Sequence, residues 1–381
     1  MEPFKNLLNE ALVRAAAGHL ARVHAAFDGA RFVALATQGL GALEMKARAM
    51  QIAGALEATL PEDFATAADA LQAALAPAPD HERLGEMHRS EEGLAGWILW
   101  AAGEYVARRG IAHPERALAL LAELTQRFSA EFAIRPFIVA YPELAFATLQ
   151  RWTMHPSSHV RRLTSEGSRP RLPWGLQLKA LIADPSPTLP LLRALQDDES
   201  EYVRRSVANH LNDIAKDHPA LVAEWLEEHL PDAPAPRRAL LKHASRTLVK
   251  KGDPRVLKAW GLGTPLRGSA TLALKPARVK LGGALQLELQ LVSAAAKPQR
   301  LVIDYAVHHV KADGRLSPKV FKGWNLELPA RGELALAKRH PLKPITTRRY
   351  HAGRHLVEVL VNGRVVAEAA FELSIPKGLQ P

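Results

Sequence analysis

Hydrophobic residues follow a helical period through the first part of the chain. They recur at spacings of three and four in segments 6–23, 96–107, 114–128 and 142–152, which is typical of amphipathic helices. Short turns marked by Pro, Asp or Gly separate the segments, as at Tyr141–Pro142. Many short helices joined by brief turns indicate stacked helical hairpins of the HEAT type.

A different pattern begins after residues 261–269. Hydrophobic and polar residues then largely alternate in segments 286–293, 300–310, 326–329, 334–342 and 355–361, which predicts β-strands. Asn362–Gly363 lies between two alternating runs and indicates a type I′ hairpin. Tyr350, just before a strand, resembles the tyrosine corner of immunoglobulin-like sandwiches.

These two patterns predict a multidomain chain, which a length of 381 residues allows. We expect an all-α HEAT-like helical-repeat solenoid over residues 1–262. An all-β immunoglobulin-like sandwich should follow over residues 268–375.

A pair of arginines recurs within the helical part. Residues 155–167 (HPSSHVRRLTSEG) match residues 198–210 (DESEYVRRSVANH), and a third copy follows at 235–244 (APRRALLKHA). The paired arginines are Arg161 and Arg162, Arg204 and Arg205, and Arg237 and Arg238. Stacked repeats place equivalent positions on one surface, so we expect a ladder that binds duplex phosphates. The alternative is a solvated face with acidic partners such as Glu201.

The distribution of charge agrees with a nucleic-acid partner. Residues 1–150 hold 13 Lys and Arg against 18 Asp and Glu, whereas residues 264–381 hold 19 against 8. Such a gradient is typical of a nucleic-acid binder whose contact surface lies in its second half. The predicted sandwich would then be a second contact with the same polyanion. The alternative is an effect of composition on solubility.

Composition limits the remaining classes. The chain has no cysteine, which excludes disulfides, thiol nucleophiles and cysteine-ligated zinc. Its first residues lack the pattern of a signal peptide, and the most apolar segment, 94–107, is too short to span a bilayer and includes Glu104. We therefore expect a cytoplasmic protein with no membrane partner that acts as a monomer.

Common catalytic motifs are missing from the sequence. There is no GxGxxG, Walker loop, HExxH or GxSxG, so we expect no cofactor and no metal. His308, His309, His351 and His355 lie on or beside predicted strands, and we expect no acidic partner near them. We expect these histidines to be surface residues.

One carboxylate stands among many cations in residues 154–175. Glu166 follows Arg161 and Arg162 and precedes Arg169 and Arg171. On a helix that begins near Ser157 or Ser158, Arg162 and Glu166 share a face. That spacing fits an ordinary ion pair or a catalytic anion. The second copy has Asn209 in place of Glu166, so balancing the arginines does not by itself explain the acid.

Two further residues raise similar questions. A helix capped by Ser129 would carry Glu131 in its first turn. Trp174 follows Pro173 and precedes Gly175, and it is either part of the core or part of a site.

Three runs of the sequence resemble a known family, at residues 131–138 (EFAIRPFI), 154–175 (MHPSSHVRRLTSEGSRPRLPWG) and 203–219 (VRRSVANHLNDIAKDHP). They are similar to the AlkC branch of the AlkC/AlkD-type bacterial DNA alkylation-repair glycosylases, as is a helical array followed by a basic immunoglobulin-like domain. The resemblance implies an enzyme that hydrolyses the N-glycosidic bond of cationic N-alkylated bases, such as 3-methyladenine and 3-methylcytosine, in double-stranded DNA. It also implies that the lesion is not fully flipped, unlike in other glycosylases.

The resemblance also implies roles for individual residues. Glu166 would be the anion near C1′ that stabilises an oxocarbenium-like sugar and orients water. Glu131 would be a second carboxylate of the cleft, and Trp174 a packing surface for the sugar or backbone. Arg162 and Arg169 would contact flanking phosphates. The alternative from another class is a non-catalytic HEAT-repeat scaffold that binds DNA or protein.

Overall fold

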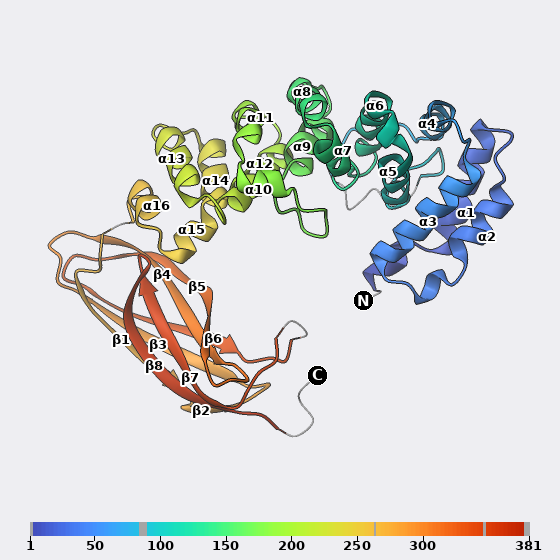
Figure 1. The fold of residues 1–381 in the computed structure, drawn as a ribbon. Helices are drawn as coiled ribbons and strands as arrows, with labels where there is room; N and C mark the ends of the chain where they lie inside the picture. Colours follow the sequence, from blue (N-terminus) through green and yellow to red (C-terminus); the bar gives the residue numbers. More distant parts are fainter. Residues whose placement is uncertain (1–2, 84–89, 263, 346–347, 377–381) are drawn as a thin grey trace. The chain divides into compact units, whose positions relative to one another are not determined.

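The computed structural model describes residues 3–83, 90–262, 264–345 and 348–376. In these ranges the chain is helical up to Ala259 and forms strands from Gly268 onward (Figure 1). The predicted fold class, a helical array followed by an immunoglobulin-like sandwich, is confirmed. The chain divides into two compact units. We call Met1–His218 with Ala233–Ala244 the helical unit, and Pro219–Asp232 with Ser245–Pro381 the sandwich unit.

The helical unit is built from short helices in chain order. They are η1 (Phe4–Leu7), α1 (Glu10–Val23), α2 (Gly29–Thr37), η2 (Leu40–Ala42), α3 (Met45–Thr59), α4 (Phe64–Ala73), α5 (Ile98–Arg109), η4 (Gly110–Ala112), α6 (Pro114–Thr125), α7 (Arg135–Ala140), α8 (Pro142–Trp152), α9 (Ser158–Gly167), α10 (Lys179–Ala183), η5 (Ser186–Thr188), α11 (Leu189–Leu195), α12 (Glu201–Ile214) and α14 (Ala235–Ala244). The four helices that periodicity predicts correspond to α1, α5, α6 and α8.

Local chemistry explains where several helices begin. Asn9 accepts a hydrogen bond from the backbone N–H of Leu12 at 2.9 Å, and Ser200 caps α12 in the same way through Val203. Pro114 and Pro142 occupy the first positions of α6 and α8, where the missing N–H has no cost. Inside the unit, leucine and alanine side chains form a continuous apolar core.

Helix α9 packs against α8, α11 and α12, and α12 packs in turn against α14. The inner face of α12 is apolar, because Val203, Val207 and Leu211 are completely buried. The arginine-pair repeats therefore form successive packed helices. This arrangement brings side chains about 40 residues apart in sequence, on α9 and α12, into contact.

Two sheets form the sandwich. The strands are β1 (Gly268–Lys275), β2 (Arg278–Lys280), β3 (Ala284–Ser293), β4 (Gln299–Val310), β5 (Leu316–Leu328), β6 (Glu333–Pro341), β7 (Gly353–Val361) and β8 (Arg364–Ser374). Their order is β1-β3-β6 in one sheet and β2-β8-β7-β4-β5 in the other. The Asn362–Gly363 hairpin is confirmed, since both residues have positive φ (49° and 77°) and Val361 pairs with Arg364.

Three helices belong to the sandwich unit, namely α13 (Pro219–His229), α15 (Arg246–Lys251) and α16 (Pro254–Ala259). Arg255 of α16 pairs with Glu224 and Glu227 of α13. The turn after α15 lies against the β7–β8 hairpin, because a Cβ on Gly363 would stand 2.5 Å from the Cα of Gly252. Only two glycines allow this approach.

The expectation that the strand histidines lie on the surface is wrong for two of them. His355 is completely buried and His309 is 5% exposed. The ring of His309 packs edge-on against His355 and Tyr350, and His355 stacks on Phe371. Alternation identifies the inward face of a strand, but it does not show that imidazoles fill the interior. His308, by contrast, pairs with Glu358 at 2.8 Å.

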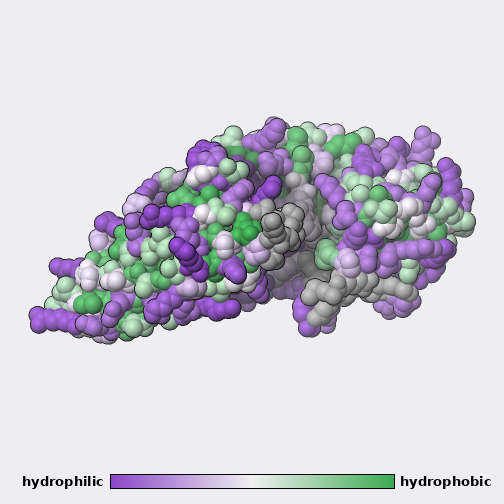
Figure 2. All heavy atoms as spheres, turned by 90° about the horizontal axis from the view of Figure 1, so that it is seen from below, coloured by the Kyte–Doolittle hydropathy of each residue, from purple (hydrophilic) through white to green (hydrophobic). Residues whose placement is uncertain are grey.

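The surface mixes polar and apolar groups. On the face drawn in Figure 2, hydrophilic and hydrophobic residues are interspersed. Within the described ranges, no helix has both the length and the apolar character needed to cross a bilayer.

The buried histidines predict that acid destabilises the sandwich. Burial lowers the pKa of His309 to about 3 and that of His340 to about 4. Because each pKa lies below the unfolded value of about 6.5, the unfolded chain binds protons first. Stability is therefore complete above that pH and is lost as the pH falls. We expect a loss of about 2 kcal/mol per histidine at pH 5, measurable by urea unfolding.

The variant His309→Gln should reduce the slope of stability against pH. The matched control is His308→Gln, which removes a histidine paired with a carboxylate and should leave most of the slope in place. An unchanged slope in His309→Gln would contradict the assignment of the acid sensitivity to the buried ring.

Candidate active site

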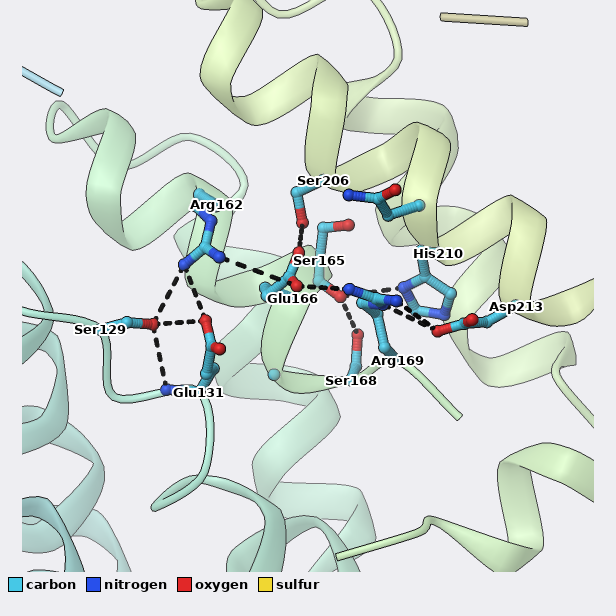
Figure 3. A network of polar contacts seen from close by, with 12 residues as sticks. Ser129, Glu131, Arg162, Ser165, Glu166, Ser168, Arg169, Ser206, His210 and Asp213 are labelled. Carbon is cyan, nitrogen blue, oxygen red and sulfur yellow. Dashed lines mark hydrogen bonds and ion pairs between the residues drawn. The ribbon is translucent and has the colours of Figure 1, made fainter. Parts of the chain in front are cut away.

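A row of polar contacts joins α9 and the residues just after it to α12 (Figure 3). Ser206 donates to Oε2 of Glu166 at 2.6 Å, and Nε of Arg169 donates to Asp213 at 2.8 Å. The guanidinium of Arg162 lies 5.0 Å from the ring centre of Tyr202. Each contact pairs a residue on α9, or just after it, with one on α12.

Glu166 is a buried anion. The residue is 6% exposed, and its Oε1 accepts a hydrogen bond from Arg169 at 2.5 Å. Arg162, four residues earlier on the same helix, lies 3.7 Å from Oε1, as its spacing predicts. Burial by itself raises the pKa of Glu166, but Arg162, Arg169 and Ser206 outweigh it and hold the pKa below the ordinary value. The carboxylate is therefore ionised at neutral pH.

Glu131 lies on the other side of Arg162. Its Oε2 accepts hydrogen bonds from Ser129 Oγ at 2.6 Å and pairs with Nη1 of Arg162 at 2.9 Å. Among the described residues, its Oε1 has no hydrogen-bond partner, and its side chain is 16% exposed against 7% for Glu166. Glu131 is thus the carboxylate with an oxygen available to a ligand.

Arg162 joins the two carboxylates. It pairs with both Glu131 and Glu166 and donates to Ser129 at 3.0 Å. Burial by itself lowers the pKa of Arg162, but Glu131 and the other groups around it raise it above the usual range. The guanidinium therefore stays charged between two anions.

The expected helix capped by Ser129 is wrong. Residues 131–134 form turns, and α7 begins only at Arg135. The reason is Pro136, which a helix begun at Ser129 would carry in its interior, where the missing N–H and the ring break the helix. In α7 the proline is in the first turn instead. Ser129 still contacts Glu131, through its side chain.

Trp174 is exposed rather than part of the core. It is 67% exposed and has a φ of 64°, a backbone conformation that non-glycine residues rarely adopt. The loop that carries it is held by Arg135, which is completely buried. Arg135 donates to the carbonyls of Gly167 at 2.8 Å and Leu176 at 2.5 Å, on either side of Trp174.

His210 adds a neutral group under the site. Its Nδ1 lies 2.9 Å from the carbonyl of Ser165, and the ring is completely buried. Burial lowers the pKa of His210 to about 3, so the imidazole is uncharged at neutral pH. Neither His210 nor Glu166 holds an acidic proton to donate near pH 7. Within the described ranges, no group of three or more His, Asp or Glu side chains could hold a metal ion.

The repeated arginines are bound to acidic side chains or backbone carbonyls. Arg161 is 8% exposed and binds both carboxylate oxygens of Asp198, at 2.7 and 3.0 Å. Arg171 pairs with Asp217, Arg205 with Glu201, and Arg237 with Asp197. Arg238 is exposed. The repeated arginines thus differ in their protein partners, and their contact with duplex phosphates stays a prediction.

Two of these arginines have the same structural role. Nη1 of Arg161 donates to the carbonyls of His155 and Pro156, five and six residues earlier. Nη1 of Arg204 donates to the carbonyls of Asp198 and Glu199 at the same spacing. In the first two pairs, the first arginine thus fixes the turn before its own helix. In the third pair, Arg237 instead binds Asp197.

Sequence reasoning missed Ser206, Tyr202 and Asp213. All three lie on one face of α12, at positions four and seven residues apart. The polar residues of α12 showed that this face was not apolar, but they did not show which residue of α9 each would meet.

Comparisons with known proteins agree with this architecture. A family model described as "DNA alkylation repair enzyme" matches residues 127–248, and another, described as "Uncharacterised protein YhaZ, C-terminal Ig-like domain", matches residues 268–375. The uncharacterized protein YhaZ of Bacillus subtilis is 35% identical over 98% of this chain and 100% of its own.

A solved structure matches this chain at the same sequence identity as YhaZ. The Pseudomonas fluorescens alkylpurine DNA glycosylase AlkC, bound to DNA containing an abasic site analog, is 35% identical, with a TM-score of 0.88. The match covers 98% of this chain and 100% of that one. The chain belongs to the AlkC branch of the AlkC/AlkD-type bacterial DNA alkylation-repair glycosylases. Glu131, Glu166 and Trp174 all lie within the residues that the alkylation-repair model matches.

Buried and exposed arginines of this AlkC-type array should contribute differently to its stability. The change Arg161→Met leaves Asp198, whose side chain is 5% exposed, buried without its cation. We expect the free energy of unfolding of the helical unit to fall by about 3–5 kcal/mol. The matched change Arg205→Met removes an exposed pair and should cost less than about 1 kcal/mol. Chemical denaturation measures both, and equal effects would contradict the structural role of Arg161.

Proposed function

We propose that this chain is a DNA glycosylase that releases cationic N-alkylated bases, with 3-methyladenine and 3-methylcytosine as its substrates, from duplex DNA. The observation that carries the proposal is the pair of carboxylates, Glu131 and Glu166, that both contact Arg162. The similarity to an alkylpurine DNA glycosylase over the whole chain supports it. As a repair enzyme it would act on cytoplasmic DNA.

The charge of the site suits this leaving group. A base alkylated at N3 is positively charged and departs as a neutral molecule with the electrons of the N-glycosidic bond. It needs no proton, and His210 and Glu166 hold none to give near neutral pH. Positive charge then develops on the deoxyribose, and a nearby carboxylate stabilises an oxocarbenium-like transition state. Water adds to C1′ and loses one proton.

The two carboxylates have different geometry and therefore different proposed tasks. Both oxygens of Glu166 are engaged, by Arg169 and Ser206, so Glu166 supplies a fixed negative charge close to the sugar. Oε1 of Glu131 has no partner among the described residues. We assign to Glu131 the positioning of the water and the acceptance of its proton.

Trp174 provides the proposed surface for the sugar. Its indole is exposed on a loop that Arg135 ties to the end of α9. A flat aromatic face packs well against a deoxyribose or an unstacked base.

Replacing either carboxylate should stop base release without preventing DNA binding. We expect Glu166→Gln and Glu131→Gln to lower the single-turnover release of 3-methyladenine by about 100- to 1,000-fold. Glu143→Gln, an exposed acid on α8, is the control. Release is measured by chromatography of alkylated DNA, with 7-methylguanine as a comparison substrate. A wild-type chain that binds alkylated DNA but releases no base would instead be a scaffold.

The salt dependence of DNA binding should identify the arginines that contact phosphate. The Arg205 side chain is 63% exposed and, within the described ranges, pairs only with Glu201 four residues before it, so it can turn toward a phosphate. We expect Arg205→Ala to weaken binding to all sequences and to reduce the slope of log K against log salt by about 1. Arg14 forms the same kind of pair with Glu10 and is equally exposed, so Arg14→Ala is the matched control. Equal slopes in the two variants would remove Arg205 from the interface.

A further inference from the structure

We infer that Ser206 of α12 is a positioning residue for Glu166, so that the catalytic anion of one repeat is aimed by the next repeat. The inference rests on the proposed function. The side chain of Ser206 is buried, and its hydroxyl donates to Oε2 of Glu166 at 2.6 Å (Figure 3). No other described residue hydrogen-bonds to that oxygen.

Two donors from opposite sides fix the plane of the carboxylate. Arg169, just after α9, holds Oε1 at 2.5 Å, and Ser206, on α12, holds Oε2. The last torsion of a glutamate is soft, because it joins an sp³ carbon to an sp² carbon. With Arg169 alone the carboxylate can pivot about Oε1. The second donor removes that freedom. A catalytic group that is out of position loses much of its effect on the rate.

A serine orients the Glu166 carboxylate without neutralising its negative charge. Arg162 lies between Glu131 and Glu166, and Arg169 is shared between Glu166 and Asp213. A third cation on Oε2 would leave Glu166 with little net negative field for a cationic transition state. A hydroxyl orients the oxygen and still leaves the negative charge in place.

The repeats show that the helix packing does not require this serine. At the matching positions the first copy has Leu163 and the third has Ala239. Leu163 is completely buried, so this position in the repeat accepts an apolar side chain. A buried hydroxyl is costly unless it is hydrogen-bonded, and in α12 its partner is Glu166. The serine therefore occurs in the repeat that faces the carboxylate.

The test is Ser206→Ala in the full-length chain, measured on alkylated duplex DNA. We expect the single-turnover rate of 3-methyladenine release to fall about 10- to 100-fold, the effect of losing a hydrogen bond to a charged group. The Kd for DNA should stay within about twofold. Ser206→Thr keeps the hydroxyl and should recover most of the rate. Ser168→Ala is the matched control, because Ser168 is completely buried nearby but donates to the carbonyl of Thr164.

A double-mutant cycle separates positioning from general stability. In the Glu166→Gln background, Ser206→Ala should change the rate by less than about twofold, because the negative charge that Ser206 positions is gone. A loss of equal size in both backgrounds, or an equal loss in Ser168→Ala, overturns the inference.

A carbon-13 NMR titration of the Glu166 carboxyl provides a readout that does not depend on activity. Loss of the Ser206 hydrogen bond should move the pKa of Glu166 upward, and an unchanged pKa overturns the inference. If the wild-type chain releases no base, the proposed function fails, whereas this titration still tests the contact.

Discussion

The sharing of Arg162 between Glu131 and Glu166 is the interaction on which the candidate site depends. Two carboxylates in one partly dry site repel each other, and one of them would ordinarily take up a proton. A guanidinium between them offsets that repulsion. It also ties the turn at Ser129 to α9, so the same contact fixes backbone and charge. The burial of Glu166 is tolerable only with such partners, since a buried charge without its counter-ion is strongly destabilising.

This arrangement limits what the arginines can do for DNA. A guanidinium that already binds two carboxylates, as those of Arg162 and Arg169 do, has few donors left for phosphate. Arg161 is similarly bound to Asp198 and two carbonyls. Arg161, Arg162 and Arg169 of this segment therefore stabilise carboxylates and turns.

Sequence patterns were sufficient to predict the helices and strands and the contacts between residues close together in sequence. The i, i+4 pair of Arg162 and Glu166 and the Asn362–Gly363 hairpin follow from local geometry alone. Contacts between elements were out of reach, because the partner of Glu166 lies 40 residues away on another helix. The buried rings of His309 and His355 were missed because strand alternation describes faces and not which polar rings pack together. The exposure of Trp174 depends on a left-handed backbone that no sequence rule assigns to tryptophan.

Two successive helix pairs of the array, α9 with α12 and α12 with α14, differ in the side chains that join them. Helix α12 contacts α9 through charged side chains, whereas toward α14 the Oδ1 atom of its Asn209 lies 2.8 Å from Nε2 of His243. Asn209 occupies the position that corresponds to Glu166, so the same architecture accepts a neutral group there. A buried ion network is often no more stable than well-packed neutral residues of similar volume. Folding alone would therefore favour neutral side chains in both helix pairs. The charge between α9 and α12 fits the proposed reaction, in which positive charge would develop on the sugar.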